Sequence, residues 1–186
     1  GTAVCEGFLF RGVIPVIKHI PGHGRAGADS HMELPVVDTA AEELSETDFA
    51  PFKALRQSPW AMTAHVVYSA LDPGSPATTS AKVIRDIIRG DIGFGGVLVS
   101  DDIGMKALGG PFAERAAAVL EAGCDLVLHC SGVMAEMEDT ARGLRPLTGE
   151  ASARLATARS LLSEGGDWDR DAVQARLDEI LGGETE

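Results

Sequence analysis

The chain has 186 residues, of which 45% are hydrophobic and 24% charged, and its formal net charge is -12. This length and composition suit one domain with a hydrophobic core and exclude a disordered or fibrous protein. The acidic balance disfavours nucleic acid as a partner, because phosphate backbones are bound by clustered Lys and Arg. No apolar run approaches the roughly 20 residues that span a bilayer, so we expect no membrane partner either.

Four short apolar runs rich in β-branched residues predict buried strands at residues 12–17, 60–66, 96–99 and 125–129. Amphipathic patterns between them predict helices at 48–56, 80–89 and 112–122, with Ser80 as an N-cap and Gly90 and Gly123 as stops. This alternation of strand and helix predicts an α/β fold with parallel strands. Further helices are expected at 133–144, 151–162 and 169–181, so the chain is interpreted as one domain, residues 1–186, whose part from about 131 is helical.

The long, mostly unpatterned segment 19–47 carries several polar groups next to a predicted strand. Lys18 and His19 leave the strand end, and the following Pro-Gly-His-Gly predicts a tight turn. Asp29 and His31 are two residues apart, so in extended chain the carboxylate can orient the imidazole. The alternative for the first pair is that His19 merely bonds a nearby carbonyl while Lys18 lies in solvent.

Polar groups also end two later strands. Asp101 and Asp102 follow the run at 96–99, where carboxylates of parallel α/β folds are often catalytic, although they could instead cap a helix near Lys106. Neighbouring side chains on a strand point in opposite directions, so only one of the two is expected to face a substrate. His65 has a similar position, with a core histidine as the alternative, and His129 is interpreted as structural.

The three cysteines are Cys5, Cys124 and Cys130. Their number is odd, their spacing does not suit a metal, and they lie in or beside apolar runs. This pattern favours buried, reduced thiols in a reducing compartment.

Taken together, these segments resemble glycoside hydrolase family 3, and within it the β-N-acetylhexosaminidases of bacterial peptidoglycan recycling. The resemblance runs from about residue 12 to 130. It rests on the motifs KHIPGHG (18–24), DSH (29–31) with LP (34–35), DFAPFKAL (48–55), MTAHV (62–66), PATTS (76–80), GFGGV (93–97) and SDDIGM (100–105). Ile20 departs from the phenylalanine usual in the family, an apolar change expected to alter packing rather than chemistry.

The resemblance implies a (β/α)8 TIM barrel of which only about the last four strand and helix units are present. A complete barrel takes about 250 residues, and the first four strands, with an arginine and an aspartate that grip the sugar, have no counterpart here. The chain is therefore interpreted as a fragment, and the isolated chain is expected to lack hydrolytic activity.

The resemblance also implies a retaining mechanism with a glycosyl-enzyme intermediate. Asp101 is then the nucleophile, and His31, on a mobile loop and oriented by Asp29, is the general acid/base. Lys18 and His19 hold sugar hydroxyls, and His65 is assigned with them to substrate binding. No metal and no cofactor are expected.

For the recycling branch, the implied substrate is a muropeptide with a non-reducing terminal N-acetyl-β-D-glucosamine, cleaved in the cytoplasm by a full-length monomer. Transfer of the sugar to phosphate instead of water stays open, as does the natural N-terminus. One alternative is an inactive fragment or sugar-binding remnant. Another is a metal-dependent hydrolase, because the chain offers the ligand types His19, His23, His31, Asp29, Asp101 and Asp102.

Overall fold

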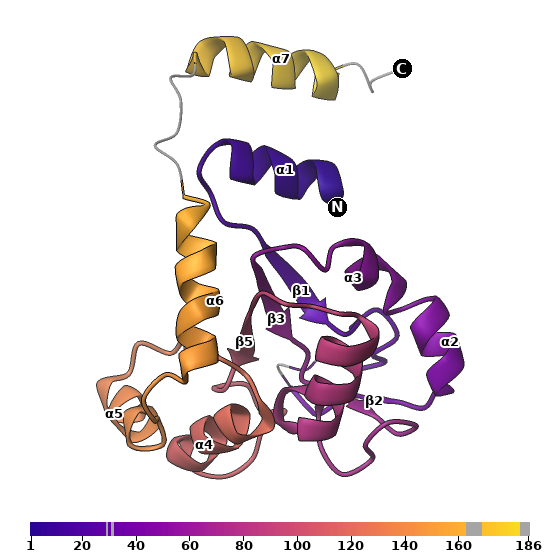
Figure 1. The fold of residues 1–186 in the computed structure, drawn as a ribbon, viewed down its shortest axis with the longest axis vertical. Coiled ribbons are helices and arrows are strands. Elements are labelled where there is room, and N and C mark those ends of the chain that lie inside the picture. Colours follow the sequence, from indigo (N-terminus) through magenta and orange to yellow (C-terminus); the bar gives the residue numbers. More distant parts are fainter. Residues whose placement is uncertain (29, 31, 163–168, 183–186) are drawn as a thin grey trace.

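The computed structural model describes residues 1–28, 30, 32–162 and 169–182. Its main sheet has four parallel strands in the order β1 (Val16–Ile20), β3 (Trp60–Thr63), β5 (Val97–Asp102) and β6 (Leu126–Leu128). The expected parallel α/β fold is confirmed. Strands β1, β3 and β5 run away from helix α1 (Thr2–Phe10), so their carboxyl ends lie at the same edge (Figure 1).

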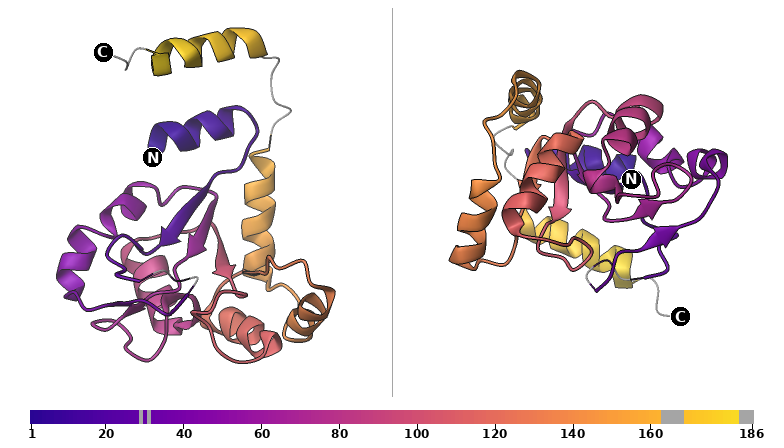
Figure 2. Two further views of the ribbon diagram at one scale, coloured as in Figure 1. Left: turned by 180° about the vertical axis from the view of Figure 1, so that it is seen from behind. Right: turned by 90° about the horizontal axis from the view of Figure 1, so that it is seen from below.

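Helices connect these strands and continue after them. They are α2 (Ala41–Glu46), α3 (Ala50–Ala54), η1 (Ala77–Thr79), the π-type helix η2 (Val83–Asp91), α4 (Phe112–Ala122), α5 (Met134–Arg142), α6 (Gly149–Ser160) and α7 (Arg170–Gly182). Figure 1 shows η2 in front of the sheet, whereas the view from behind in Figure 2 shows the strands with no helix in front of them. Among the described residues, no helix is both long and apolar enough to cross a membrane.

Most predicted helices are present with shifted ends. The range 112–122 coincides with α4, and Gly123 ends it in the left-handed conformation with φ of 113°. Ser80 caps the following helix, because its Oγ accepts a hydrogen bond of 3.1 Å from the Val83 amide. Gly90 as a helix stop is wrong, since η2 continues to Asp91, and the helix expected at 48–56 is reduced to α3.

The first strand boundary is also wrong, with consequences for the site. Pro15 has no N–H to donate to a sheet, and the strand begins after it, at Val16. Lys18 and His19 therefore lie within β1 instead of beyond it. In the same way β5 extends through Asp101 and Asp102. The sequence pattern did not predict the two-residue parallel pair β2 (Val36–Val37) and β4 (Val67–Tyr68).

The core is formed where η2 and α4 pack on the sheet. Apolar side chains of the strands and the two helices are buried together, among them Ala61, Leu98, Ile84, Ile88 and Val119. Helix α7 buries none of its residues. The assignment of residues 1–186 to one domain stays a prediction.

The buried carboxylate of Asp125, just before β6, forms hydrogen bonds that connect four elements. The Asp125 side chain is 4% exposed and accepts hydrogen bonds from Arg89 of η2 at 3.0 Å and Arg154 of α6 at 2.8 Å. The Leu98 amide of β5 donates to the same carboxylate at 2.9 Å. Because Asp125 immediately precedes β6, this network joins β5 and β6 to both helices.

All three cysteines are free thiols, but they are not all buried. Cys124 is buried, and burial raises the pKa of its thiol to about 12. Cys130 is exposed, so the expectation of burial is wrong for this residue. It follows the end of β6, where the chain leaves the sheet at its polar edge.

The turn after β1 gives a testable contrast between two glycines. Gly22 has φ of 153°, and a Cβ there would lie 2.9 Å from the Asp48 carbonyl oxygen, whereas a Cβ on Gly24 meets nothing within 4 Å. We expect Gly22→Ala to lower the free energy of unfolding by about 1–3 kcal/mol because the backbone must shift. Gly24→Ala is the control and should leave it nearly unchanged in urea titrations. Equal effects would contradict the steric argument.

Candidate active site

The carboxyl ends of β1 and β5 bring His19 and Asp101 together. The His19 Nε2 lies 3.5 Å from the Asp101 Oδ2, and both side chains are only partly exposed, at 27% and 13%. A bulge on each strand helps to aim them, since the register slips between Lys18 and Ile20 on β1 and between Val99 and Asp102 on β5. Bulges re-aim side chains in this way and are frequent next to active sites.

The two adjacent aspartates have different partners. Asp101 Oδ1 accepts a 2.9 Å hydrogen bond from the Asp102 amide, which leaves Oδ2 facing His19. The Asp102 carboxylate instead accepts from the amides of Gly104 at 2.9 Å and Cys130 at 3.1 Å. Each aspartate lies near an imidazole, since Asp102 Oδ1 is 3.6 Å from His129 Nδ1. The difference is that this Asp102 oxygen is already bound by two amides, whereas Asp101 directs toward His19 the oxygen that its amide contact does not use.

His19 is placed to act as a neutral hydrogen-bonding group. Burial lowers the pKa of its imidazole, and the positive charge of Lys18 acts in the same direction, while Asp101 opposes them. Lys18 itself is exposed. Such a ring can donate to or accept from a ligand hydroxyl without carrying a charge beside the carboxylate.

His23 joins this group, although it was predicted only as a ligand type for the metal-dependent alternative and not as a sugar-binding or catalytic residue. Its ring centroid lies 5.5 Å from that of His19, and its Nε2 lies 3.3 Å from the Ser30 Oγ. Ser30 is 4% exposed. The feature of the sequence that could have indicated a role for His23 is its place in the Gly-His-Gly turn. The contact to Ser30 depends on how the loop folds back, which spacing alone does not give.

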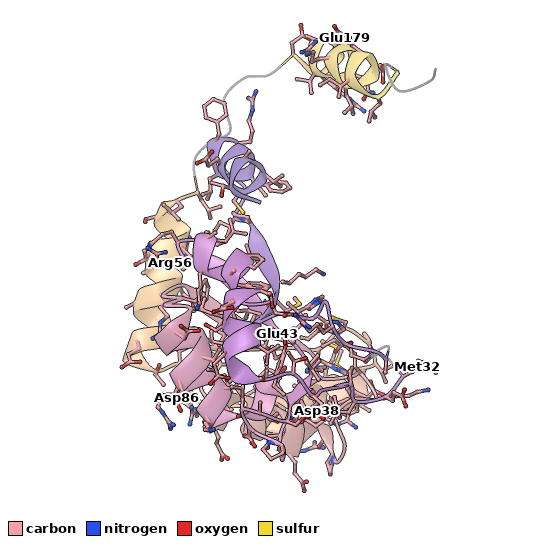
Figure 3. The ribbon with its side chains drawn as sticks, turned by 90° about the vertical axis from the view of Figure 1, so that its right-hand side faces the viewer. Met32, Asp38, Glu43, Arg56, Asp86 and Glu179 are labelled. Carbon is pink, nitrogen blue, oxygen red and sulfur yellow. The ribbon has the colours of Figure 1, made fainter. Side chains whose placement is uncertain are left out.

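Asp29 and His31 lie outside the described residues, so their predicted roles stay predictions. Their described neighbours have contrasting environments, because Ser30 is buried and Met32 is 62% exposed. Met32 lies at the outer edge of the molecule in Figure 3.

His65 does not have the position expected of a sugar ligand. It has no exposed surface, and both ring nitrogens have partners: Nδ1 contacts the Thr78 Oγ1 at 2.8 Å, and Nε2 contacts the Asp102 carbonyl at 3.0 Å. A ring nitrogen already bonded inside the protein cannot also hold a hydroxyl of a ligand. The physical reason is that the chain beyond β3 turns inward and packs His65 between η1 and β5.

The turn after β1 forms ion pairs and a hydrogen bond with neighbouring segments of the chain. Arg25 pairs with Asp48 at 2.6 Å and with Glu43 of α2 at 2.8 Å, and the buried Tyr68 hydroxyl donates to the Gly22 carbonyl. Figure 3 labels Glu43 on α2. These contacts hold the turn from both sides, and they join residues too distant in sequence for a local pattern to predict.

The described residues offer no group of three or more His, Cys, Asp or Glu side chains placed to hold a metal ion. A cavity of about 350 Å³ lies elsewhere, between α6 and the starts of β3 and β5, where Pro59, Gly96 and Arg154 line it. Polar chemistry and cavity thus lie at different edges of the sheet. Four strands supply only part of the loops that enclose a barrel site, so we do not require an enclosed cavity at the active site. We therefore place the candidate site at His19 and Asp101.

We expect the imidazoles of the partly buried His19 and the buried His65 to become protonated only at a pH below the ordinary 6.5. Burial lowers the pKa of both His19 and His65 from the ordinary 6.5, so both are neutral in the fold at pH 7. A lowered His pKa adds stability that is present above pH 6.5 and is lost as pH falls through the folded-state pKa. We expect NMR titration midpoints below 6.5 for both rings. A midpoint at or above 6.5 for His65 would contradict its neutral, buried state.

The chain is similar to known proteins over most of its length. The family model described as "Glycosyl hydrolase family 3 N terminal domain" matches residues 1–158. A beta-hexosaminidase of Alkalilimnicola ehrlichii is 47% identical over 124 residues, which cover 64% of this chain and 35% of that protein. A beta-hexosaminidase of Tolumonas auensis is 38% identical over 175 residues, which cover 91% and 50% respectively.

Solved structures show the same relationship. A glycoside hydrolase family 3 beta-N-acetylglucosaminidase from Paenibacillus sp. FPU-7 has a TM-score of 0.78 at 33% identity, covering 91% of this chain and 35% of that one. NagZ from Neisseria gonorrhoeae has a TM-score of 0.74 at 34% identity, covering 97% and 50%. This chain therefore spans half or less of the length of these relatives, and its sheet is part of a TIM-barrel-like fold. From the family match, the shared fold and the strand-end chemistry together, we conclude that the chain belongs to glycosyl hydrolase family 3.

Proposed function

We propose that this chain is the nucleophile-bearing part of a retaining β-N-acetylhexosaminidase. The observation that carries the proposal is the Asp101 carboxylate at the end of β5, with Oδ1 held by a backbone amide and Oδ2 facing a neutral His19. The relatives named beta-hexosaminidase support the sugar specificity. Membership of the family supports the reaction class.

In the first step, Asp101 Oδ2 attacks the anomeric carbon while the bond to the leaving-group oxygen breaks. His31, oriented by Asp29, gives its proton to that oxygen. In the second step His31 takes a proton from water, the water oxygen attacks the anomeric carbon, and the bond to Asp101 breaks. Lys18 and His19 hold the sugar hydroxyls, with bonds that strengthen as the ring flattens.

For the substrate, we propose a muropeptide with terminal N-acetyl-β-D-glucosamine, hydrolysed in the cytoplasm by a monomer of the full-length protein without a cofactor. The acidic charge of the chain supports a partner other than nucleic acid. Names such as beta-N-acetylglucosaminidase among the structural relatives support the terminal sugar.

The test compares the 186-residue chain with the same chain preceded by the N-terminal barrel half of a relative. Both are incubated with an aryl N-acetyl-β-glucosaminide, and then with a 5-fluorinated N-acetyl-β-glucosaminyl fluoride as a trap. We expect turnover, and label on Asp101, in the extended form alone. The isolated chain supplies only part of the loops that enclose the site, so it cannot hold the sugar in a reactive position. Robust turnover by the isolated chain would refute the expectation that it is inactive.

The label itself decides between the remaining interpretations. Turnover by the extended form with label on another residue would overturn the assignment of Asp101. Sugar binding without turnover or label in either form would favour a sugar-binding remnant over an enzyme.

A further inference from the structure

Strand β5 continues past the end of its neighbour β3. The last paired residues are Met62 of β3 and Val99 of β5, whereas β5 runs on to Asp102. On its other side this end is held by β6, since the Ile103 amide donates to the Leu128 carbonyl at 2.9 Å. The edge toward β3 therefore has no strand to pair with, in the segment that carries Asp101.

The buried His65 replaces the missing strand at this edge. Its Nε2 lies 3.0 Å from the Asp102 carbonyl oxygen, and it comes from the chain that leaves β3. A carbonyl oxygen can only accept a hydrogen bond, so the proton is on Nε2. This side chain supplies the donor that a longer β3 would have supplied from its backbone.

The other ring nitrogen then has a defined role. Burial lowers the pKa of His65, so the ring is neutral and its Nδ1 accepts a hydrogen bond. The Thr78 hydroxyl has one proton and two acceptors in reach, His65 Nδ1 at 2.8 Å and the Ala64 carbonyl at 3.0 Å. With the ring proton on Nε2 it donates to Nδ1, and the Thr63 hydroxyl donates to the Thr78 Oγ1 in turn, at 2.8 Å. The bonds run in one direction, from Thr63 through Thr78 and His65 to the Asp102 carbonyl.

Asp102 passes this constraint to the nucleophile. Its amide donates to Asp101 Oδ1 at 2.9 Å, while its own carboxylate is bound by the amides of Gly104 and Cys130. The residue is thus held through its amide, its side chain and its carbonyl, and the carbonyl accepts from His65 Nε2 at 3.0 Å and from the Met105 amide at 3.1 Å. A shift of Asp102 would rotate the Asp101 carboxylate.

We propose that His65 is a positioning residue for the proposed nucleophile, acting through the Asp102 backbone to keep Asp101 Oδ2 directed at the sugar. The inference rests on the proposed function, because it takes Asp101 as the attacking group. It replaces direct sugar binding as the role of His65.

Two substitutions of nearly equal volume isolate the Nε2 donor. His65→Gln retains an N–H near the position of Nε2, and His65→Met has the same number of rotatable side-chain bonds as Gln but no donor. In the Met variant the Thr78 hydroxyl can turn to donate to the Ala64 carbonyl, 3.0 Å away, so the loss falls on the Asp102 carbonyl, which loses the imidazole donor and keeps the Met105 amide at 3.1 Å. Both are made in the chain extended by an N-terminal barrel half, with the unmutated extended chain as reference.

The measurements are kcat, KM and the rate at which the 5-fluoro sugar labels Asp101, with thermal unfolding as a check on folding. We expect His65→Met to lower kcat and the labelling rate by about 10- to 100-fold, the scale on which misplacement of a reacting group acts, with KM changed by less than about threefold. His65→Gln should recover most of the rate. Equal rates in all three proteins would overturn the proposal, as would equal losses in both variants, which would point to the ring's shape.

A direct measurement covers the case in which His65→Met does not fold. The 15N spectrum of the unmutated protein reports which ring nitrogen of His65 carries the proton, and we expect Nε2. A proton on Nδ1 alone would overturn the proposal without reference to any variant. If the unmutated protein gives no label on Asp101, the proposed function fails instead, so the two failures are distinguishable.

Discussion

Replacing Asp101 with Asn should lower kcat by roughly 10⁴-fold or more and abolish labelling by the 5-fluoro sugar, because the amide cannot form the glycosyl-enzyme ester. The measurement is steady-state kinetics on an activated aryl glycoside, in the chain extended by the barrel half. Asp101→Ala should regain partial turnover with added azide. Azide then attacks the anomeric carbon from the face that the carboxylate vacated, the aryloxide leaves, and an α-glycosyl azide is released.

Asp102→Asn is the matched control, since it changes the neighbouring carboxylate. The Asn Oδ1 can still accept from the amides of Gly104 and Cys130, which Asp102 Oδ1 binds here. We expect this variant to keep the label on Asp101 with a smaller fall in kcat. If Asp102→Asn loses the label and Asp101→Asn retains it, the two aspartates have been assigned the wrong way round.

Replacing Asp125 with Ala should lower the free energy of unfolding by about 3–5 kcal/mol, the cost of removing one partner from a buried ion pair. Arg89, 18% exposed, would be left without this carboxylate, and Leu98 would lose the acceptor of its buried amide. Arg154 would lose its pairing at 2.8 Å. Urea unfolding of the extended chain, followed by circular dichroism, measures the shift.

The control for this prediction is Asp86→Ala, which removes an exposed carboxylate paired with Arg85 at 2.7 Å. Pairs of this kind contribute little, because water and salt screen both charges. We expect an unchanged unfolding midpoint. If Asp125→Ala shifts the midpoint no further than Asp86→Ala, the buried network adds no net stability.

Local sequence pattern determined the elements and their order. Helix α4 is where the pattern placed it, because Phe112–Ala122 has apolar residues on one face and a glycine that can adopt positive φ after it. Strand positions followed from short apolar runs, but their ends did not. Pro15 delays β1, and β5 continues into polar residues, because pairing with β6 holds it beyond its apolar part.

The site was predictable as a set of residue types and less so as a geometry. Asp101 and His19 were identified by position and motif, and their approach at 3.5 Å agrees with strand ends at one edge of a parallel sheet. The contact of His23 with Ser30 requires the folded loop, which no spacing rule describes. Asp29 and His31 stay predictions.

The class of fold, the family resemblance and the residues able to do chemistry could therefore be predicted from the sequence, because they depend on residue type and order along the chain. Tertiary structure decided which of these residues are accessible and what each one contacts. His65 shows the difference: its position at a strand end suited a ligand, but β3 ends before it can pair with Asp102, and the buried ring donates to the Asp102 carbonyl alongside the Met105 amide. Likewise, the sequence pattern predicts only that Asp125 begins a strand. The tertiary packing brings two arginines to its carboxylate. Such contacts join residues distant in sequence, where local periodicity carries no information.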